Sequence, residues 1–229
     1  MDYLYTAFHT ASLDGTPVLN PLWYLYPSDP ATWPIDLQFF FGDSILVSPV
    51  TAENSTSVDF YLPKDRFYDF VTRQPVEGQG KNVSLTNVNF TTIPVHIRSG
   101  TILPLRVDGA MTTTELRKKD FEIVVAQNAK GEATGSLYID DGVSLVQKTA
   151  TEVQFQFTKN KLTTKGHFRF TTGVKFAIAS ILGVEKRPTM TMLNGKVVSS
   201  KMLQYDAVSK VVTVQLNMAM TKEFTLELF

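Results

Sequence analysis

The feature that most constrains the fold is a period-two alternation of apolar and polar side chains, which begins near Ser44 and continues to the C-terminus. It is clearest over residues 58–62, 153–157, 212–216 and 224–228, where every second side chain is Val, Phe or Leu. Successive side chains of a β-strand point to opposite faces, so this pattern is typical of strands with one buried and one solvent-facing side. The sequence therefore predicts antiparallel β-sandwiches over most of its length.

Turn-forming residues separate these segments. Asn194-Gly195 is typical of a type I′ hairpin turn, and Asp140-Asp141-Gly142 also predicts a turn, because Asp and Gly adopt tight-turn dihedral angles readily. The small and polar residues 108–114 favour a linker. We therefore expect a proximal β-sandwich domain over residues 44–110 and a distal β-sandwich domain over residues 111–229.

The first 43 residues have a different pattern. Leu4, Phe8 and Ala11 follow helical spacing, residues 16–26 predict a buried strand, and residues 31–40 predict a short helix closed by Gly42. A single helix–strand–helix unit cannot complete a sheet of its own. We expect either that the chain is a truncated form or that an upstream partner packs against this segment.

Charge and composition exclude several classes of function. Lys plus Arg number 22 and Asp plus Glu also number 22, so the chain has no charge excess to attract a polyanion such as nucleic acid. It has no cysteine, which rules out disulfides, thiolate nucleophiles and Cys-ligated metals. Its longest apolar runs are much shorter than the roughly 20 residues that span a bilayer, so we expect no membrane span.

No motif in the sequence provides a complete catalytic or metal centre. The three histidines, His9, His96 and His167, are far apart and outside any HExxH or HxH arrangement, and we expect them at surface or interface positions. The sequence also lacks GxSxG, P-loop and GxGxxG motifs. We therefore predict no catalytic residue, no metal ligand and no cofactor-binding residue in this chain.

Two further groups have both a functional and a structural explanation. Asp140 and Asp141 could act as an acid/base pair or bind calcium, but neighbours at one strand end do not face each other across a cleft, so a turn is favoured. A local group of aromatic residues could stack on sugar rings, but aromatics of a buried strand usually fill a core, and we expect that role. This group comprises Trp23, Tyr24, Tyr26 and Trp33.

Three sequences of the form Asn-X-Ser/Thr lie within a short stretch of the proximal domain. They begin at Asn54, Asn82 and Asn89, and none has proline in the middle position. Such tripeptides are acceptors for N-glycosylation in secreted proteins. Their clustering in predicted loops and strand edges favours a secreted, extracellular glycoprotein with these three candidate sites.

Several short blocks of distinctive sequence lie along residues 3–145. The most distinctive are DLQFFFGDSILVSPV at residues 36–50 and IPVHIRSGTILP at residues 93–104. Shorter blocks are YLYT at 3–6, GTPV at 15–18, Pro-Leu at 21–22, VDFYLP at 58–63, FYD at 67–69 and GSLYIDDG at 135–142. Together they resemble glycoside hydrolase family 31, especially the fungal and other eukaryotic α-glucosidases. Residues beyond Leu145 are compatible with the distal β-domain of that family.

The resemblance implies a position within such an enzyme. Residues 1–43 would be the last helix–strand–helix portion of a (β/α)8 barrel, followed by the two antiparallel β-sandwich domains of a mainly β chain. The two catalytic aspartates of the family would lie upstream, and no segment here matches their motifs. The family often has Arg before Pro-Leu and Pro before Tyr-Leu-Tyr, where this chain has Asn20 and Asp2.

The resemblance also implies a function for the assembled enzyme. This would be retaining hydrolysis of terminal α-linked glucose from α-glucosides or maltooligosaccharides, through a covalent glucosyl intermediate and without a metal. The chain, inactive alone, would complete the barrel and support the active site of an N-terminal catalytic chain, which it binds non-covalently. An independent β-sandwich module that binds carbohydrate or braces another protein is the alternative. Within the family, α-xylosidase and transglucosidase activities stay open.

Overall fold

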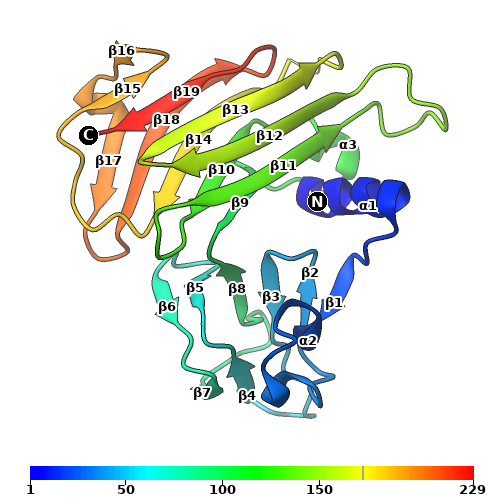
Figure 1. Cartoon of the computed structure of the whole chain (residues 1–229). Coiled ribbons are helices and arrows are strands. Elements are labelled where there is room, and N and C mark those ends of the chain that lie inside the picture. The colour runs from blue at the N-terminus through cyan, green and yellow to red at the C-terminus, as the bar shows by residue number, and fades with distance from the viewer. Residues whose placement is uncertain (172) are drawn as a thin grey trace.

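The computed structural model describes residues 1–171 and 173–229. Figure 1 shows a large β-sheet in the upper half and a smaller sheet below it, with helix α1 (Asp2–Asp14) lying against the large sheet. A two-stranded sheet lies at the end of the molecule farthest from the large sheet. The fold is mainly β, which confirms the prediction from the alternating sequence pattern.

The smaller sheet has six strands in the order β1-β2-β3-β8-β5-β6, and every described pair is antiparallel. Together with the two-stranded sheet of β4 and β7, it buries Leu22, Phe40, Leu46, Phe60 and Phe67. The strands are β1 (Leu19–Pro21), β2 (Phe39–Phe41), β3 (Ile45–Val47), β4 (Ser57–Leu62), β5 (Arg66–Asp69), β6 (Pro75–Glu77), β7 (Lys81–Thr86) and β8 (Val95–Arg98).

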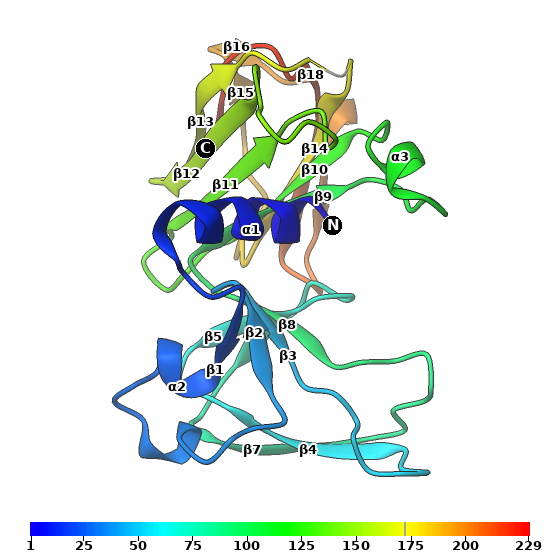
Figure 2. The ribbon, with the colours of Figure 1, turned by 90° about the vertical axis from the view of Figure 1, so that its right-hand side faces the viewer.

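The large sheet has eleven strands in the order β16-β15-β19-β13-β12-β11-β9-β10-β14-β18-β17. Turned by 90°, it shows two halves that face each other (Figure 2), and their inward side chains share one core that includes Phe121, Phe155 and Phe176. The strands are β9 (Thr101–Arg106), β10 (Phe121–Ala126), β11 (Ala133–Ile139), β12 (Thr151–Thr158), β13 (Lys161–Phe168), β14 (Lys175–Leu182), β15 (Thr191–Leu193), β16 (Lys196–Val197), β17 (Leu203–Asp206), β18 (Val211–Ala219) and β19 (Thr225–Leu228).

The large sheet is not purely antiparallel. Strands β10 and β14 run parallel along their length, and β9 meets β11 in parallel where Thr101 lies beside Thr134. Between β10 and β14 the chain forms β11, β12 and β13, which belong to the same sheet and lie beyond β9 on the other side of β10. Alternation within a strand shows which side is buried, but it does not identify the neighbouring strand, so the sequence did not reveal this pairing.

Two local predictions for the first 43 residues are wrong. Residues 16–26 do not form one strand. They contain the short strand β1, and Pro21 then serves as the N-cap of helix α2 (Leu22–Leu25), which ends the strand. Residues 31–40 contain the end of the 3-10 turn η1 (Pro30–Thr32), capped by Asp29, and then strand β2. Proline at position 34 lacks the N–H that a longer helix would need.

The chain passes from the smaller sheet to the large sheet just before β9. Strand β9 pairs with β10 over six residues, so the expected division at residues 110 and 111 falls between two neighbouring strands of the large sheet. The segment expected to be a linker joins these strands and leads into helix α3 (Thr113–Leu116). A second 3-10 turn, η2 (Ser200–Met202), precedes β17. The expected linker is exposed, and both strands that it joins belong to the large sheet.

Candidate functional site

Helix α1 is attached to the large sheet by a buried ion pair. The Arg106 guanidinium on β9 lies 2.6 Å from Asp2 Oδ1 and 3.0 Å from Asp2 Oδ2, and both side chains are almost fully buried. Arg106 also donates to the carbonyl oxygens of Arg117 and Lys119 and lies 3.8 Å from the ring centroid of Phe121. These contacts fix the first turn of α1. Sequence reasoning missed them, because the two residues are more than a hundred positions apart.

A polar and aromatic cluster anchors the rest of α1 to strand β11. The Tyr5 hydroxyl lies 2.8 Å and 2.9 Å from the two carboxylate oxygens of Asp140, and His9 stacks on the ring of Tyr138 with centroids 3.5 Å apart. The Thr6 hydroxyl accepts a bond from the backbone N–H of Tyr138. Burial and the Asp140 carboxylate raise the pKa of Tyr138 to about 12, so its hydroxyl stays protonated in ordinary buffers.

The adjacent aspartates follow β11 and begin the loop over residues 140–150, so the tripeptide does not form a tight hairpin turn between β11 and β12. Asp140 is buried and its Oδ1 accepts from the backbone N–H of Gly142, while Asp141 accepts from the N–H groups of Val143 and Ser144. The hydroxyl and backbone donors of Ser144 lower the pKa of Asp141, which therefore stays ionised. Since Asp140 is also engaged by Tyr5, the pair is used in structure and does not face a cleft.

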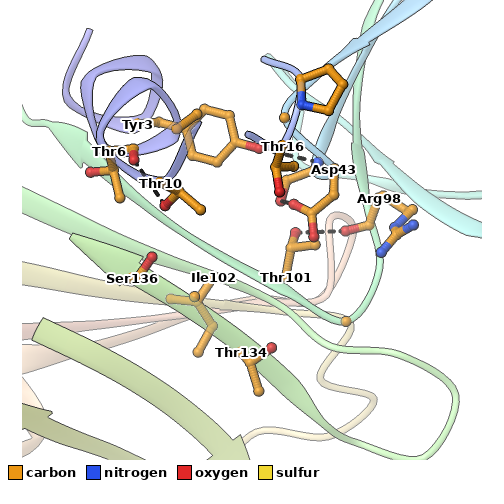
Figure 3. A pocket seen from close by; sticks show the side chains of 16 residues that line it. Tyr3, Thr6, Thr10, Thr16, Asp43, Arg98, Thr101, Ile102, Thr134 and Ser136 are labelled. Atoms are coloured by element: carbon orange, nitrogen blue, oxygen red, sulfur yellow. Dashed lines mark hydrogen bonds between the residues drawn. The ribbon is translucent and has the colours of Figure 1, made fainter. Parts of the chain in front are cut away.

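A cavity of about 320 Å³ lies between α1, the β2–β3 turn and the neighbouring strands β9 and β11 of the large sheet. Figure 3 shows Tyr3 and Thr10 reaching from α1 toward Thr16 and Asp43 on the opposite wall. The Tyr3 hydroxyl donates to the carbonyl of Phe41 and accepts from the N–H of Ser44, and burial raises its pKa to about 12. The lining comprises Tyr3, Thr6, Ala7, Thr10, Thr16, Pro17, Gly42, Asp43, Ser44, Arg98, Gly100, Thr101, Ile102, Thr134, Gly135 and Ser136.

The lining determines what chemistry this cavity can support. Hydroxyl groups dominate it, Asp43 is its one carboxylate, and Arg98 is its one cation. Glycoside hydrolysis of the usual kind needs two carboxyl groups on either side of the scissile bond. The cavity can therefore hold water or a small polyhydroxylated molecule, but it lacks the acid/base pair for hydrolysis. Within residues 1–171 and 173–229, no group of three or more His, Asp or Glu side chains could hold a metal ion.

The histidines occupy three different environments. His9 packs on Tyr138 at the helix–sheet contact, and His167 is exposed on β13. His96 is buried on β8 between the rings of Phe60 and Phe67, so the expectation of a surface or interface position is wrong for this residue. Burial lowers its pKa, and its Nδ1 has no hydrogen-bond partner within the described structure. Strands β4 and β7 cover the face of the smaller sheet that the sequence pattern predicted to be solvent-exposed, and His96 lies on that face.

The aromatic residues of the first 43 positions do not form the core that the sequence predicted. Trp23 and Tyr24 are each 46% exposed on α2, and Trp33 is 62% exposed after η1. Tyr26 differs, because its hydroxyl donates to Asp65 Oδ2 at 2.9 Å and burial raises its pKa. The predicted strand would have buried alternate side chains, whereas the turn at Pro21 starts a helix and redirects them.

These aromatics belong to a wider group of exposed apolar side chains, the N-terminal apolar set. Four of its members lie on α1, β1 and α2, which are on the side of the molecule that faces the viewer in Figure 2, and the other two lie between η1 and β2. Strand β1 is an edge strand whose one described neighbour is β2, so its outer edge is free for further pairing. Large exposed apolar groups mark interaction surfaces in folded proteins. The set comprises Phe8, Leu19, Trp23, Tyr24, Trp33 and Leu37.

Asn20, at the position where the family often has arginine, is buried on β1. Its side-chain amide donates to the carbonyls of Gly42 at 2.7 Å and Pro17 at 3.2 Å. Its Oδ1 is buried and has no partner among the described atoms. The residue therefore holds β1 to the β2–β3 turn at the rim of the cavity.

The three candidate glycosylation sites are all exposed. Asn82 lies on β7 opposite Tyr61, Asn54 lies in a turn with φ of 56°, and Asn89 lies in the loop between β7 and β8. One candidate site therefore lies on a strand, and the other two lie in loops. No helix in the described part of the chain is long and apolar enough to span a membrane.

Comparison with known proteins relates the chain to one group of enzymes. Residues 15–103 match the Glycosyl hydrolase family 31 C-terminal domain. The chain is 46% identical over 221 residues to a probable alpha/beta-glucosidase of Arthroderma benhamiae, covering 96% of the chain and 25% of that protein. It is 51% identical over 183 residues to a probable alpha/beta-glucosidase of Neosartorya fischeri, covering 80% of the chain and 21% of that protein.

A solved structure has the same fold. The glucosidase II alpha subunit superposes with a TM-score of 0.85 at 25% identity, covering 100% of this chain and 27% of the subunit. The chain thus spans about a quarter of the length of the relatives that it matches. Residues 15–103 carry the C-terminal domain of glycosyl hydrolase family 31, and the whole chain corresponds to the C-terminal portion of α-glucosidase-like members of that family.

Proposed function

We propose that this chain is the C-terminal part of a retaining α-glucosidase and that it completes and braces a catalytic barrel supplied by an N-terminal partner chain. The observation that carries the proposal is the N-terminal apolar set beside the free edge of β1. Unpaired strand edges and exposed aromatics favour association, because pairing satisfies the backbone groups and burial removes apolar surface from water. The names of the relatives support the choice of enzyme class.

In this proposal, α1, β1 and α2 are the last elements of a (β/α)8 barrel. The outer edge of β1 would pair with a barrel strand of the partner, and Leu19 and Trp23 would pack under barrel helices. The large sheet would then act as a rigid base, because the Asp2–Arg106 ion pair and the Tyr5–Asp140 bond tie α1 to it. Displacement of an active site by even 1 Å costs catalytic rate, so such bracing matters for the chemistry.

The reaction proposed for the assembled enzyme is hydrolysis of terminal α-linked glucose from α-glucosides or maltooligosaccharides. A retaining mechanism uses one carboxylate as nucleophile and a second as general acid/base. Neither the cavity below α1 nor the Asp140–Asp141 segment provides that pair, so both groups would come from the partner chain. With no cysteine in this chain, the two chains would be held by non-covalent contacts. The proposed location is extracellular.

The test is a mass and activity measurement on the natively purified protein. We expect denaturing intact-mass analysis to give the 25.6 kDa chain together with a larger chain, and native mass analysis to give their complex. The complex should hydrolyse a chromogenic α-glucoside, and separating the chains should abolish hydrolysis until they are mixed again. A folded and inactive 25.6 kDa species with no larger chain would contradict the proposal.

A second candidate is an independent β-sandwich module that binds carbohydrate or braces another protein. One observation favours it: α1 already packs on the large sheet of its own chain, so this helix does not depend on a partner. A monomeric chain that unfolds cooperatively and binds immobilised α-glucan through Trp23 and Trp33 would support this candidate. Loss of binding on Trp33→Ala, with unchanged stability, would separate binding from folding.

A further inference from the structure

An apolar groove lies beside β4 and β7. These strands form the two-stranded sheet at the end of the molecule farthest from the large sheet (Figure 2). It has a volume of about 200 Å³ and runs between residues 49–56 and 88–93. Two backbone hydrogen bonds fix its walls: the N–H of Val88 donates to Thr56 O at 2.8 Å, and the N–H of Ser48 donates to Pro94 O at 3.0 Å. The groove is therefore held at both ends by regular backbone contacts.

The groove exposes apolar side chains that no residue of the described structure covers. Phe90 is 95% exposed and Ile93 is 58% exposed, while Val88 forms a buried floor. Exposed apolar area costs roughly 25 cal/mol per Å² relative to a buried position, so a cover for this groove would be favourable. The N-terminal apolar set lies on other elements, so a partner docked there need not reach this groove.

Two of the three N-glycosylation sequons line this groove. Asn54 lies on one wall and Asn89 on the other, and both asparagines are exposed. The third, Asn82, lies on β7 opposite Tyr61 and borders a different depression, next to Gln38. Two sequons therefore lie at the groove, and the third, which has the same chemistry, lies away from it.

The geometry at Asn89 leaves its amide nitrogen available. Its Oδ1 accepts from the N–H of Thr91 at 3.0 Å, the hydroxyl of Thr91 at 2.7 Å and the hydroxyl of Thr92 at 2.9 Å. The carbonyl side of the amide is thereby engaged, and no described hydrogen bond occupies Nδ2. The sequon hydroxyl that glycosylation requires is already in contact with the acceptor amide.

We propose that N-linked oligosaccharide attached to Asn89, and a second attached to Asn54, covers this groove. The first N-acetylhexosamine rings would pack their C–H faces on Phe90 and Ile93, since aromatic side chains combine a large apolar surface with a defined face. In the attachment step, Asn89 Nδ2 bonds to the anomeric carbon of an oligosaccharide carried on a lipid-linked pyrophosphate, and the proton that Nδ2 loses is taken up by the departing pyrophosphate. The bond from that carbon to the pyrophosphate oxygen breaks, and the lipid pyrophosphate leaves.

The first test is site mapping on the full-length protein secreted by a eukaryotic host. Enzymatic release of N-glycans in heavy-oxygen water converts each occupied asparagine into a labelled aspartate, which peptide mapping locates. We expect labels at Asn89 and Asn54. An unlabelled Asn89, or a full-length protein that never enters the secretory pathway, would overturn the proposal.

The second test asks whether the glycan covers the groove. Asn89→Gln should remove the mass of one glycan and increase the fluorescence of a bound hydrophobic dye, and Phe90→Ser added to that variant should return the signal to the wild-type level. Thr91→Ala should act like Asn89→Gln if the latter folds poorly, because it removes the sequon hydroxyl. Asn82→Gln is the matched control, which should not increase dye binding. Equal dye binding by the Asn89→Gln and Asn82→Gln proteins would overturn the covering role.

This inference is independent of the proposed enzymatic activity. Hydrolysis of a chromogenic α-glucoside, measured on the same samples, reports on that activity separately. An active protein without label at Asn89 contradicts the glycan proposal alone, and an inactive protein with labelled Asn89 contradicts the enzymatic one alone.

Discussion

The large sheet and the N-terminal segment bury their apolar side chains in different ways. In the large sheet, Phe121, Phe155, Phe176 and Phe224 are almost fully buried against one another. In the first 43 residues, Trp23, Trp33 and other apolar side chains remain exposed beside a free strand edge. We therefore expect the large sheet to carry most of the stability of the isolated chain. In the proposed two-chain enzyme, the exposed side chains of the N-terminal segment would contact the partner.

The strongest test of the first half of this comparison is Phe176→Ala. The Phe176 ring lies about 6 Å from the rings of Phe121, Phe155 and Phe224, at 6.0, 5.8 and 5.8 Å between centroids. Removing it leaves a cavity at the centre of the core, and we expect a loss of about 3–5 kcal/mol in the free energy of unfolding. Urea unfolding measures this loss. A loss below about 1 kcal/mol would show that the large sheet is not the stabilising half.

The next largest effect is expected for Arg106→Ala, which separates α1 from the large sheet. The substitution leaves the Asp2 carboxylate buried without a partner, and removing one member of a buried ion pair costs about 3 kcal/mol or more. Undocking of α1 limits the cost, because the helix can open locally while the sheet stays folded. Amide hydrogen exchange in α1 should accelerate strongly.

The exposed pair between Lys118 and Glu115 provides the control for this variant. Both side chains of that pair are more than half exposed. Lys118→Ala should change stability by about 0.5 kcal/mol or less. Equal effects of Arg106→Ala and Lys118→Ala would mean that the buried pair does not hold the two regions together.

Gly42→Ala tests the contact between α1 and the smaller sheet. Gly42 has φ of +55°, and a Cβ there would lie 2.3 Å from the hydroxyl oxygen of Tyr3. We expect a loss of about 1–3 kcal/mol, because the left-handed backbone and the clash both oppose the new side chain. Tyr3→Phe removes the clashing oxygen and should recover part of the loss. Thermal unfolding of the single and double variants measures this coupling.

Gly15→Ala separates backbone strain from the clash. Gly15 has φ of +79°, but a Cβ there would meet no atom within 4 Å. Its substitution should cost about 1 kcal/mol and should be insensitive to Tyr3→Phe. An equal response of both glycine variants to Tyr3→Phe would remove the proposed role of the Tyr3 contact.

His96 gives the smaller sheet a pH dependence of stability. Burial lowers its pKa in the folded state below the unfolded value of about 6.5, so the unfolded chain binds the proton more readily. The stabilisation from the neutral histidine is complete above about pH 6.5 and is lost as the pH falls toward the folded-state pKa. The slope is at most about 1.4 kcal/mol per pH unit.

Urea unfolding between about pH 5 and pH 8 tests this dependence. His96→Gln should flatten the slope near pH 6, while His167→Gln, a change at an exposed position on β13, should leave it unchanged. A slope that survives in the His96→Gln protein would mean that another group causes it.

The smallest effect on the isolated chain is expected for Trp23→Ser. Trp23 is 46% exposed, so its substitution should change the stability of the isolated chain by about 0.5 kcal/mol or less. In the proposed two-chain enzyme, the same change should weaken association, because buried tryptophans contribute strongly to interfaces. Analytical ultracentrifugation of the complex measures this difference. Val208→Ser, an exposed apolar position in the β17–β18 turn, is the control.

Local sequence patterns identified the elements that depend on local rules. The alternation at residues 153–157 corresponds to β12, and Asn194-Gly195 joins β15 to β16 with positive φ at both residues. Asp140 and Asp141 break the strand pattern as expected and accept backbone N–H groups at the start of the β11–β12 loop. Each of these depends on the alternating direction of strand side chains or on dihedral angles that Asn, Asp and Gly tolerate. The family resemblance rests on similar short, collinear blocks.

Other predictions failed because the deciding contacts lie far away in the sequence. His96 is buried because β4 packs over its sheet, which the alternation within β8 does not reveal. The pairing of β10 with β14 and the placement of β9 in the large sheet depend on the curl of the whole sheet. The groove shared by Asn54 and Asn89 likewise arises from the bond between Val88 and Thr56.

The sequence by itself determined the mainly β character, the turns, the family and the three sequons, because each is written in a few neighbouring residues. Only the tertiary structure decided which apolar side chains stay exposed, which strands share a sheet and how α1 is attached. Whether a side chain is buried depends on which other elements pack over it. Hydrogen bonds such as Tyr5–Asp140 join residues that are distant along the chain. A local pattern therefore predicts an element, while packing between elements decides what that element contacts.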